Sequence, residues 1–342
     1  MQARTWPPHL LGWTLPAVIG AAAWWSPWAA LAAMLGFQAM LALLERVPAW
    51  RRTPAPEAAA PAPWLSYRTV LRLHGPWQAA LLALGVAIAA AGSHGVAAVV
   101  ALGVAVGGVT GSQGITFAHE LGHARSRVDR VLAWLLMGSV LYAHFMVEHY
   151  RGHHVRAATH DDPASARRGE SLWRFLPRTL AGSLDSAWRL EAARLRTMRR
   201  GWPRSPLAWA TAAQLAGLTA LGLALGPLAL LFWLVQSAYA VFLLETINYI
   251  DHYGLQRAET GGRREPFGMA HAWNADHRPT NWFIANLQRH SDHHMQAWKP
   301  YETLEALPGP QLPTGYAGCL FLASVPPLWF RVMHARLPAA AV

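Results

Sequence analysis

The sequence contains a single cysteine, Cys319, among its 342 residues. One thiol cannot form an internal disulfide, and it cannot supply the ligands of an iron–sulfur cluster or of an iron site with four cysteines. A zinc ribbon built on cysteine pairs is excluded for the same reason. If the chain carries out redox chemistry, we therefore expect its electrons to come from another protein.

Charged residues are also scarce, at 14% of the chain against about 25% in ordinary soluble domains. Hydrophobic residues make up 53%, and there are 18 tryptophans, a residue that favours membrane interfaces. This composition predicts an integral membrane protein. The net charge of +11 then indicates a basic face toward anionic lipids or acidic partners, and we do not expect nucleic acid as a partner.

Six apolar segments have lengths near the ~20 residues that a bilayer-spanning helix requires. Three very short links, Ser26-Pro27, Gly92–Gly95 and Gly226-Pro227, join them in pairs and predict three helical hairpins. Only Arg4 precedes the first segment, so we expect a retained anchor rather than a cleaved signal peptide. The predicted spans cover residues 10–25, 27–45, 77–93, 95–117, 207–225 and 227–250.

The basic residues are distributed very unevenly between the two predicted sides. None of the 29 Lys and Arg lies in a hairpin link. The positive-inside rule therefore predicts that both termini and all long loops are cytoplasmic and that the three tight turns lie outside. The basic residues fall within Arg4, Arg46–Arg72, Arg125–Arg204 and Arg257–Arg336.

A seventh apolar segment, residues 131–147, has basic flanks on both sides, at Arg125–Arg130 and Arg151–Arg156. A crossing there would place two histidine clusters on opposite sides of the membrane, so we expect an interfacial or re-entrant helix. Residues 170–204 mix Arg with Leu and Trp, which predicts a helix on the membrane surface.

The remaining segments complete one predicted all-α membrane domain over residues 1–342. Residues 251–342 are expected to form a cytoplasmic cap of helices and loops that holds the histidines, and 317–330 to cover the site. The Pro- and Ala-rich residues 48–63 predict a flexible loop without chemistry. Five glycines between 103 and 118 allow close helix packing, and they also leave room for an apolar substrate channel.

Histidine is concentrated in four short stretches. His119-Glu-Leu-Gly-His123 and His290-Ser-Asp-His-His294 place imidazoles on one face of a helix, by their spacing of three and four residues. Glu148-His-Tyr-Arg-Gly-His-His154 and Asn248–Gly254 add four more. One metal ion takes about six ligands at most, so nine imidazoles predict two metal ions. The expected ligands are His119, His123, His149, His153, His154, His252, His290, His293 and His294.

Acidic residues beside these histidines are expected to accept a hydrogen bond from the far ring nitrogen of a ligand, which fixes the ring's tautomer and direction. We expect no nucleophile, and we expect His144 to pack one turn before the second stretch. The supporting residues are Glu120, Glu148, Asp251 and Asp292, with Asp162 and His271 as further candidates; His9, His74, His94, His160, His277 and His334 are expected at the surface or the membrane interface.

The first stretch also matches the His-Glu-x-x-His pattern of zinc proteases, with Glu120 as the base. The seven other histidines disfavour an intramembrane protease, because a zinc hydrolase needs only three protein ligands. A metal transporter would place ionisable residues within its spans, and these spans contain almost none apart from Glu245.

The four stretches resemble those of the integral-membrane alkane hydroxylase (alkane 1-monooxygenase) family. That family carries His-Glu-x-x-His, Glu-His-x-x-Gly-His-His, Asn-Tyr-x-Glu-His-Tyr-Gly and Leu-Gln-Arg-His-Ser-Asp-His-His, and the likeness covers residues 100–305. Asp251 stands where the family usually has Glu, and Ala124 where Lys is common. Neither change removes a histidine, so they bear on substrate range and partner docking rather than on metal binding.

The resemblance implies a non-haem di-iron monooxygenase of the bacterial inner membrane that uses O2 to convert n-alkanes from the bilayer to 1-alkanols. It implies electrons from rubredoxin and its NAD(P)H-dependent reductase. An unactivated C–H bond does require a metal–oxygen oxidant, because side chains alone cannot supply one. Membrane fatty-acid desaturases or hydroxylases and xylene-type methyl hydroxylases share this style of histidine pattern and remain alternatives.

Overall fold

A computed structural model of the protein describes residues 7–51 and 67–338. Apart from one short hairpin of two strands, the regular secondary structure of the described residues is helical. Most of the predicted loop 48–63 lies outside the described residues; the part that is described contains the short helix η2 (Pro48–Trp50).

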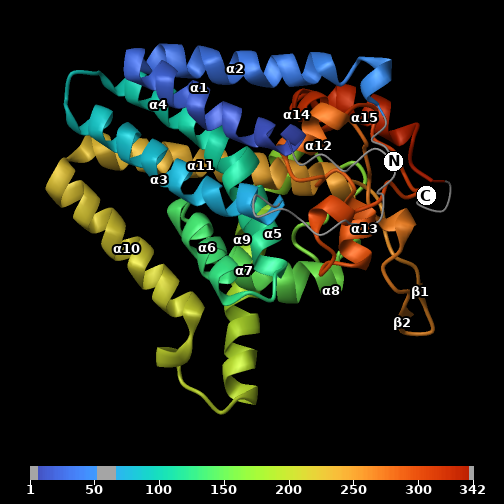
Figure 1. Ribbon diagram of the computed structural model, residues 1–342. Helices are drawn as coiled ribbons and strands as arrows, with labels where there is room; N and C mark the ends of the chain where they lie inside the picture. The colour runs from blue at the N-terminus through green and yellow to red at the C-terminus, as the bar shows by residue number, and fades with distance from the viewer. Residues whose placement is uncertain (1–6, 52–66, 339–342) are drawn as a thin grey trace.

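The three predicted helical hairpins are present. In each of them two long helices are joined by the predicted short link, and the three turns lie at the same end of the bundle (Figure 1). Gly226, in the third link, has a φ of +86°, a conformation that glycine adopts without a steric penalty. The hairpins pair α1 (Leu11–Trp25) with α2 (Pro27–Leu44), α3 (Tyr67–Ala90) with α4 (Val96–Val109), and α10 (Pro206–Leu225) with α11 (Pro227–His252).

Five helices are long and apolar enough to cross a membrane: α2, α3, α10, α11 and the continuous helix Val96–His123. The predicted all-α membrane architecture is confirmed at this level. The first predicted span, α1, has only 15 residues, about 22 Å of helix, and falls short of the usual length. The third begins ten residues earlier than predicted, at Tyr67, because α3 continues through Arg68 and Arg72.

The glycines of α4 allow it to pack closely against α11. A Cβ atom added to Gly107 would lie 2.6 Å from the carbonyl oxygen of Gln236, and one added to Gly111 would lie 2.7 Å from Cα of Ala240. The packing interpretation of the glycine-rich segment is therefore confirmed. The segment continues through the π-helical turn η3 (Thr110–Ile115) into α5 (Thr116–His123).

The apolar segment around residues 131–147 enters the bundle and turns back. Helix α6 (Arg127–Ser139) ends where Gln78 Nε2 donates to Ser139 Oγ at 2.8 Å and Gln236 Nε2 donates to Ser139 O at 3.0 Å. Both glutamines lie well inside their long helices, α3 and α11. The chain then reverses at Leu141, whose φ is +58°. It returns through α7 (Phe145–Glu148), the π-helical η4 (His149–His153) and α8 (His154–Arg156).

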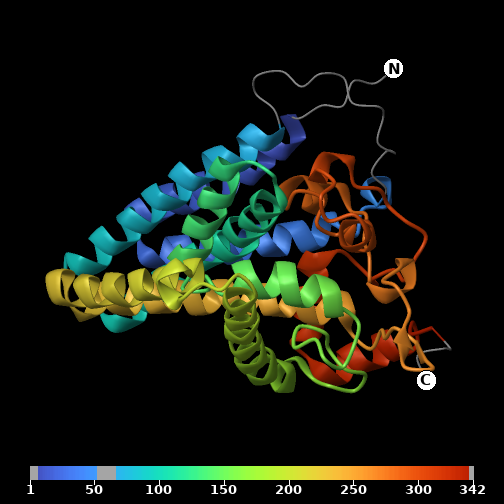
Figure 2. The same cartoon turned by 90° about the horizontal axis from the view of Figure 1, so that it is seen from below.

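Helix α9 (Leu172–Thr197) runs across the long helices, and its last part projects away from the bundle in both views (Figures 1 and 2). A helix that runs across the long helices agrees with the prediction of a helix on the membrane surface over residues 170–204. The short helix η5 (Trp202–Arg204) then leads into α10.

The C-terminal segment covers the end of the bundle opposite the hairpin turns, which we call the histidine end (Figure 1). Glu45, just past α2, fixes this segment because its buried carboxylate accepts hydrogen bonds from Thr280 Oγ1 (2.7 Å) and from the backbone N–H of Gly318 (2.9 Å). The elements are β1 (Glu259–Thr260), β2 (Arg263–Arg264), η6 (Met269–His271), α12 (Arg278–Phe283), α13 (His290–Met295), η7 (Tyr301–Thr303), α14 (Tyr316–Ala323) and α15 (Pro326–His334).

Three histidines that were expected at the surface or the membrane interface are buried, so that prediction was wrong for them: His9, His74 and His277. The His9 ring packs edge-on between Tyr67 and Tyr301, at centroid distances of 5.3 and 5.2 Å. The His74 ring shares a 3.2 Å hydrogen bond with Gln78. Aromatic and amide partners make burial of a neutral imidazole acceptable.

Candidate metal centre

All nine predicted histidines meet at the histidine end, in two adjoining groups. Within each group the imidazole nitrogens that face the centre lie within 4.8 Å of one another. Each group draws on elements far apart in the sequence, so the centre forms only when the bundle and the C-terminal segment are together. The five-histidine group contains His119, His123, His149, His154 and His293, and the four-histidine group contains His153, His252, His290 and His294.

The second stretch is divided between the two groups because its helix is π-wound. In a π-helix the residue five positions on, rather than four, lies over the first. Thus His149 Nε2 and His154 Nε2 approach to 2.9 Å and belong to one group, whereas His153 belongs to the other. The His149 and His153 rings still stack, at a centroid distance of 5.2 Å, but they belong to different groups.

The four-histidine group is closely convergent. His290 Nε2 lies 3.3 Å from His252 Nε2 and 3.0 Å from His294 Nε2. Adjacent nitrogens around a metal ion with bonds of about 2.0–2.1 Å are separated by about 2.9–3.4 Å. His252 is the last residue of α11, and His290 and His294 share a face of α13, so two elements far apart in the sequence place these nitrogens.

Several buried ring nitrogens lack any hydrogen-bond partner among the described residues. They include Nδ1 of His119, Nε2 of His123, Nε2 of His153 and both nitrogens of His293. Leaving a buried polar atom unpaired costs about 1–3 kcal/mol. A set of convergent, unpaired imidazole nitrogens is what a metal ion bound by neutral imidazoles requires. The donor set therefore fits non-haem metal binding.

Burial keeps most of these imidazoles neutral, which is the form that binds metal. It lowers the pKa of His149, His154, His290, His293 and His294 well below the ordinary value, and neighbouring imidazoles lower it further. His153 differs, because the adjacent Asp162 carboxylate outweighs burial and raises its pKa. Burial acts to raise the pKa of Asp162 in turn, but the His153 ring and its hydrogen bond lower it overall.

Two of the predicted supporting carboxylates contact histidines of the centre, and both serve the four-histidine group. Asp162 Oδ2 accepts a 2.9 Å hydrogen bond from His153 Nδ1. Asp251 Oδ2 lies 3.5 Å from His290 Nδ1 and accepts a 2.9 Å hydrogen bond from the Tyr316 hydroxyl. These contacts direct the Nε2 atoms inward, toward the centre.

The other predicted supporting residues have different partners, so their predicted contact with a ligand ring was wrong. Glu148 pairs with Arg156 at 2.6 Å, and Asp292 pairs with Lys299 at 2.6 Å. Glu120 lies against Tyr301 and Glu302, in the wall of a cavity that His123 also lines.

His271 contributes through its backbone rather than its ring. Its carbonyl oxygen lies 3.3 Å from His252 Nδ1, while its ring contacts Glu265 at 2.9 Å and accepts from the N–H of Gly268. His144 packs against Tyr142 with a ring distance of 4.1 Å, as predicted.

Three polar residues that support the centre were not predicted. Tyr316 holds Asp251, as described above. Asn274 holds α13, because its Nδ2 donates to Ser291 Oγ at 2.8 Å and its Oδ1 accepts from the N–H of Ser291 at 2.9 Å. Glu245, noticed only as an unusual charge near the end of a span, is buried and accepts from Tyr142 (2.7 Å) and Thr179 (2.8 Å). A search for polar residues beside apolar runs would have flagged Glu245 and Tyr316, whereas Asn274 lies in a mixed segment without such a signal.

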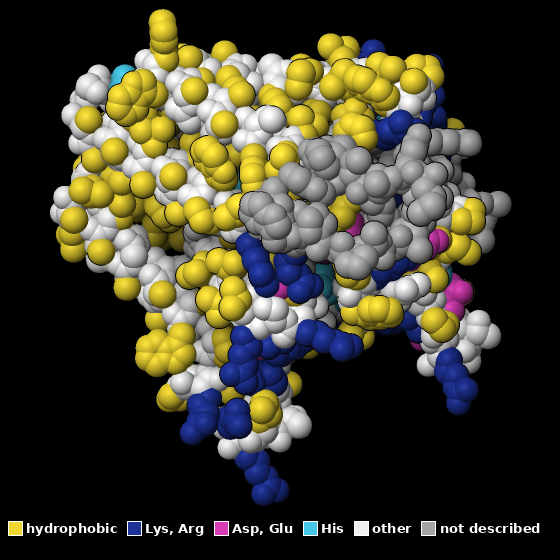
Figure 3. Space-filling model, viewed as in Figure 1, with side chains coloured by type: hydrophobic (Ala, Val, Ile, Leu, Met, Phe, Trp, Pro, Cys, Tyr) yellow, Lys and Arg dark blue, Asp and Glu magenta, His cyan; other side chains and the backbone are white. Residues whose placement is uncertain are grey.

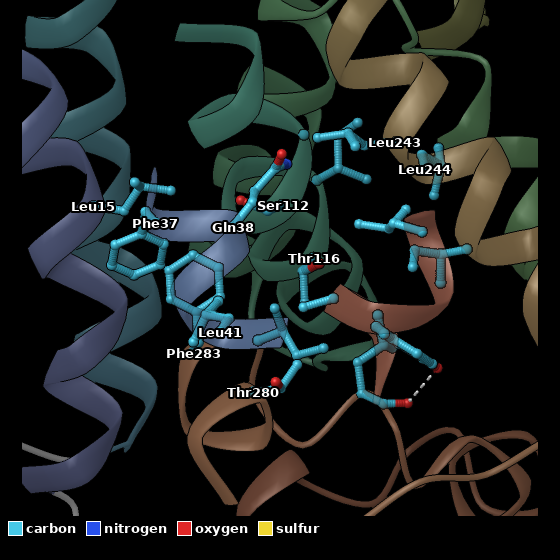
Figure 4. Close-up of a pocket in the computed structure, with 18 of the residues that line it drawn as sticks. Leu15, Phe37, Gln38, Leu41, Ser112, Thr116, Leu243, Leu244, Thr280 and Phe283 are labelled. Atoms are coloured by element: carbon cyan, nitrogen blue, oxygen red, sulfur yellow. Dashed lines mark hydrogen bonds between the residues drawn. The ribbon is translucent and has the colours of Figure 1, made fainter. Parts of the chain in front are cut away.

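An apolar cavity of about 80 Å³ lies within the bundle, lined by residues of the long helices and of the C-terminal segment (Figure 4). Since about 10–15 Å³ of such space holds one water molecule, the cavity has room for several heavy atoms. Two of its lining residues, Thr116 and Leu287, each precede a histidine of the centre by three residues, and Leu15 and Phe37 line it as well. None of its lining residues is charged.

A second cavity, of about 260 Å³, reaches the five-histidine group from outside. Its wall includes His123, and its other lining residues include Arg68, Trp298 and Lys299. The Trp298 side chain is 71% exposed. The first cavity is thus lined by uncharged residues and the second by several charged ones.

Comparison with known proteins places the chain in a family. The model of the fatty acid desaturase family matches residues 94–318. An alkane 1-monooxygenase of Pseudomonas aeruginosa is 44% identical over 242 residues, which cover 69% of this chain and 63% of that protein. The corresponding enzyme of Acinetobacter baylyi is 39% identical, with 69% and 59% covered.

A more distant relative is the hydroxylase component of a xylene/toluene monooxygenase from Pseudomonas putida, at 29% identity over 66% of this chain and 60% of that protein. The chain thus spans less than two thirds of the length of these curated relatives. The family-model match, over residues 94–318, includes all four histidine stretches, and the identity is higher to the alkane enzymes than to the xylene enzyme. The chain belongs to the fatty acid desaturase family, and the relatives that are 39–44% identical to it are named alkane 1-monooxygenases.

Proposed function

We propose that this protein hydroxylates the terminal carbon of n-alkanes, using O2 and giving 1-alkanols. The observation that carries the proposal is an uncharged cavity among apolar helices: its lining includes Thr116 and Leu287, each three residues before a histidine of the centre, and Tyr316, whose hydroxyl donates to Asp251 beside His290. The relatives named as alkane 1-monooxygenases support the same reaction.

We propose two iron ions as the cofactor, one for each histidine group. The convergent, unpaired imidazole nitrogens support two metal ions, and membership of a desaturase-like family supports iron. The ligands would be the nine histidines, with Asp162 and Asp251 orienting His153 and His290. Bound iron would supply the activation of O2, for which side chains have no adequate chemistry.

The overall change balances as R–CH3 + O2 + 2 e⁻ + 2 H⁺ giving R–CH2OH + H2O. The chain's own residues would position the substrate and exclude water. Phe37 and Leu15 hold the hydrocarbon by burying it, and Thr116 and Leu287 direct its end toward the centre. Because the cavity opens among apolar helices, the substrate would enter from the lipid bilayer.

We propose rubredoxin, reduced by an NAD(P)H-dependent reductase, as the electron donor. The single cysteine is buried in α14 and cannot by itself hold an electron-transfer centre. The cavity beside His123 is lined by Arg68 and Lys299 as well as by Glu120 and Glu302, and exposed Trp298 offers an apolar contact there; the net charge of +11 supports docking of a small acidic carrier.

For location we propose the bacterial inner membrane, with six spans and with both termini and the metal centre on the cytoplasmic side. The hairpin turns carry no Lys or Arg, and the histidine end lies opposite them (Figure 1). A reporter fused to the C-terminus should give a cytoplasmic signal; a periplasmic signal would overturn this orientation.

The decisive experiment is product identification in membranes supplied with rubredoxin, its reductase and NADH. Octane or hexadecane should give the 1-alkanol, at about two irons per chain. Methyl-hydroxylated xylene without alkanol would favour the xylene-type alternative, and an unsaturated acyl product would favour a desaturase. Zinc alone, together with activity that survives His293→Ala, would overturn the proposal in favour of a hydrolase.

A further inference from the structure

Helix α10 is the least buried of the long helices. Of its 20 residues only Leu207 is buried, and 6% of its apolar window lies inside the protein. A groove of about 420 Å³ separates it from α6, and Trp233 of α11 contributes to its wall. Its volume lies in the usual range for small-molecule sites, about 300–1,000 Å³. Figure 3 shows a recess lined by hydrophobic side chains on this face.

Small residues create the space in this groove. A Cβ added to Gly138 of α6, or to Gly217 of α10, would meet nothing within 4 Å. The two walls are joined at one level, where Gln214 Nε2 donates to the carbonyl oxygen of Gly138 at 3.1 Å. None of the lining residues is charged. The groove therefore suits a long apolar chain.

The two helices that form the groove begin at the same end of the bundle. Helix α6 begins beside α3, where Arg72 pairs with Asp129 at 2.6 Å, and α10 ends at the hairpin turn with α11. At a rise of about 1.5 Å per residue, Arg130 lies roughly 12 Å before Gly138, and the first residue of α10, Pro206, roughly 12 Å before Gln214. Arg204 precedes Pro206 by two residues, in η5. Both arginines consequently lie at the mouth of the groove, toward the histidine end.

The residues at this mouth are held in place by hydrogen bonds, but several of their arginines have no acidic partner within the described part of the chain. Ser205 Oγ donates to Glu191 at 2.8 Å, and Trp209 Nε1 donates to Pro203 O at 2.9 Å, so the link between α9 and α10 is held in place. Among the described residues, the exposed side chains of Arg130, Arg200 and Arg204 make no ion pair, although Arg194 nearby pairs with Glu191. Lys and Arg side chains gather below the apolar face (Figure 3).

We propose that this groove binds an anionic phospholipid, with one acyl chain between α6 and α10 and the phosphate at Arg130 and Arg204. Basic pockets between membrane helices on the cytoplasmic side favour anionic head groups, and a charge-assisted bond from arginine to phosphate is strong. Trp202 and Trp209 flank the mouth, where aromatic residues meet the head-group region. A hydrocarbon without a head group would fill the groove, but it would not pair with the arginines at its mouth.

The lipid would supply packing that the protein itself lacks. It would fill the space between α10 and α6, and α6 leads through α7 directly into His149. Bound lipid should therefore stabilise the helix that carries the second histidine stretch. The inference rests on the proposed orientation of the bundle and does not depend on the identity of the oxidised substrate.

The full chain is purified in mild detergent from membranes that contain phosphatidylglycerol and phosphatidylethanolamine, and retained lipid is measured by native mass spectrometry. The wild type should retain phosphatidylglycerol several-fold above its share in the membrane. The double variant Arg130→Gln/Arg204→Gln should lose this enrichment. Gly217→Phe, which fills open space in the groove, should lose it too. Arg189→Gln is the matched control, because Arg189 is exposed but already pairs with Asp185.

A second measurement separates binding from folding. Phosphatidylglycerol added to the delipidated wild type, but not phosphatidylcholine, should raise its melting temperature by several degrees, and the double variant should not respond. Retention in proportion to membrane content would overturn the proposal. So would enrichment that survives the double substitution, displacement of the lipid by alkane regardless of its head group, or cross-linking of α10 to a second copy across the groove.

Discussion

The two histidine groups lie side by side but are supported differently. In the four-histidine group, His153 and His290 face the carboxylates of Asp162 and Asp251, and His252 faces a backbone carbonyl. Among the described residues, no carboxylate lies within ion-pair distance of the five-histidine group, which instead borders the cavity at His123. The four-histidine group is therefore buried and its rings are oriented by carboxylates. The five-histidine group is packed among aromatic rings and is accessible from outside through the cavity.

This difference suggests a division of labour within one centre. Carboxylates that orient imidazoles raise ligand basicity and fix the ring positions, which suits a rigid site. Ligands that lack such partners and border a cavity can adjust when a partner protein or O2 arrives. Both groups share α13, because His293 belongs to one and its neighbours His290 and His294 belong to the other.

The largest effect should come from removing one histidine of each group. His119→Ala and His290→Ala should each lower bound iron by about one ion per chain and reduce alkanol formation by more than about 100-fold, since loss of a supporting residue alone costs about 10–100-fold. Metal analysis and product assays on matched protein check this. Full iron content in either variant would contradict the proposal that each histidine group binds one iron ion. His160→Ala, at an exposed position, is the control.

Removing a supporting carboxylate should affect only the four-histidine group. Asp162→Asn keeps the shape but removes the charge beside His153, so metal affinity should fall by about 10–100-fold. Competition with a fluorescent chelator measures this affinity. Asp185→Asn, in an exposed pair with Arg189, should leave it unchanged. An equal loss at both metal sites would contradict the proposed asymmetry.

The five-histidine group, which borders the cavity at His123, should release its metal first. With excess chelator, the wild-type protein should lose iron in two phases that differ several-fold in rate, because the cavity at His123 gives access to one group and the other is buried. Stopped-flow absorbance follows the two phases. Trp298→Ala widens the opening and should speed only the fast phase. A single phase would show that the two groups are equally accessible.

A smaller effect is expected at Tyr316, which links the apolar cavity to the four-histidine group. Tyr316→Phe removes the hydroxyl that donates to Asp251, and a hydrogen bond to a charged group contributes about 1.5–3 kcal/mol. The free energy of unfolding should fall by that amount, and iron affinity at the four-histidine group should fall several-fold. Thermal unfolding and chelator competition test the two effects separately. A loss of stability with unchanged iron affinity would reduce Tyr316 to a packing role.

The smallest effect is expected at Cys319, three residues further along α14. Its side chain is fully buried, and burial, aided by the negative charge of Glu45, raises the pKa of the thiol well above its usual value. Maleimide should therefore leave Cys319 unmodified until the protein unfolds, and Cys319→Ala should change activity by less than about twofold, because it removes one small group. Rapid labelling of the folded protein would show that the segment covering the four-histidine group opens.

Much of the fold followed from the sequence. Apolar length, short links and charge placement predicted the three hairpins, and basic flanks predicted that 131–147 would not simply cross. The errors were at boundaries and at isolated polar residues. Helix α3 starts earlier than hydropathy indicates, because helical hydrogen bonding continues past the apolar part. His9, His74 and His277 are buried, and distant aromatic residues pack against two of them, Tyr67 and Tyr301 against His9 and Phe117 against His74; such distant partners leave no local pattern.

For the centre, the sequence by itself determined which nine histidines would meet, because their spacing and their position at the ends of apolar segments are local properties. Only the tertiary structure decided how they divide. A π-turn places His149 with His154 rather than with His153, and packing of the C-terminal segment brings Tyr316 to Asp251. Likewise Asp162 reaches a ligand ring, while Asp292, between two of the histidines in sequence, turns to Lys299. The physical reason is that helical spacing fixes the face on which a side chain lies, whereas its partner depends on what packs against that face.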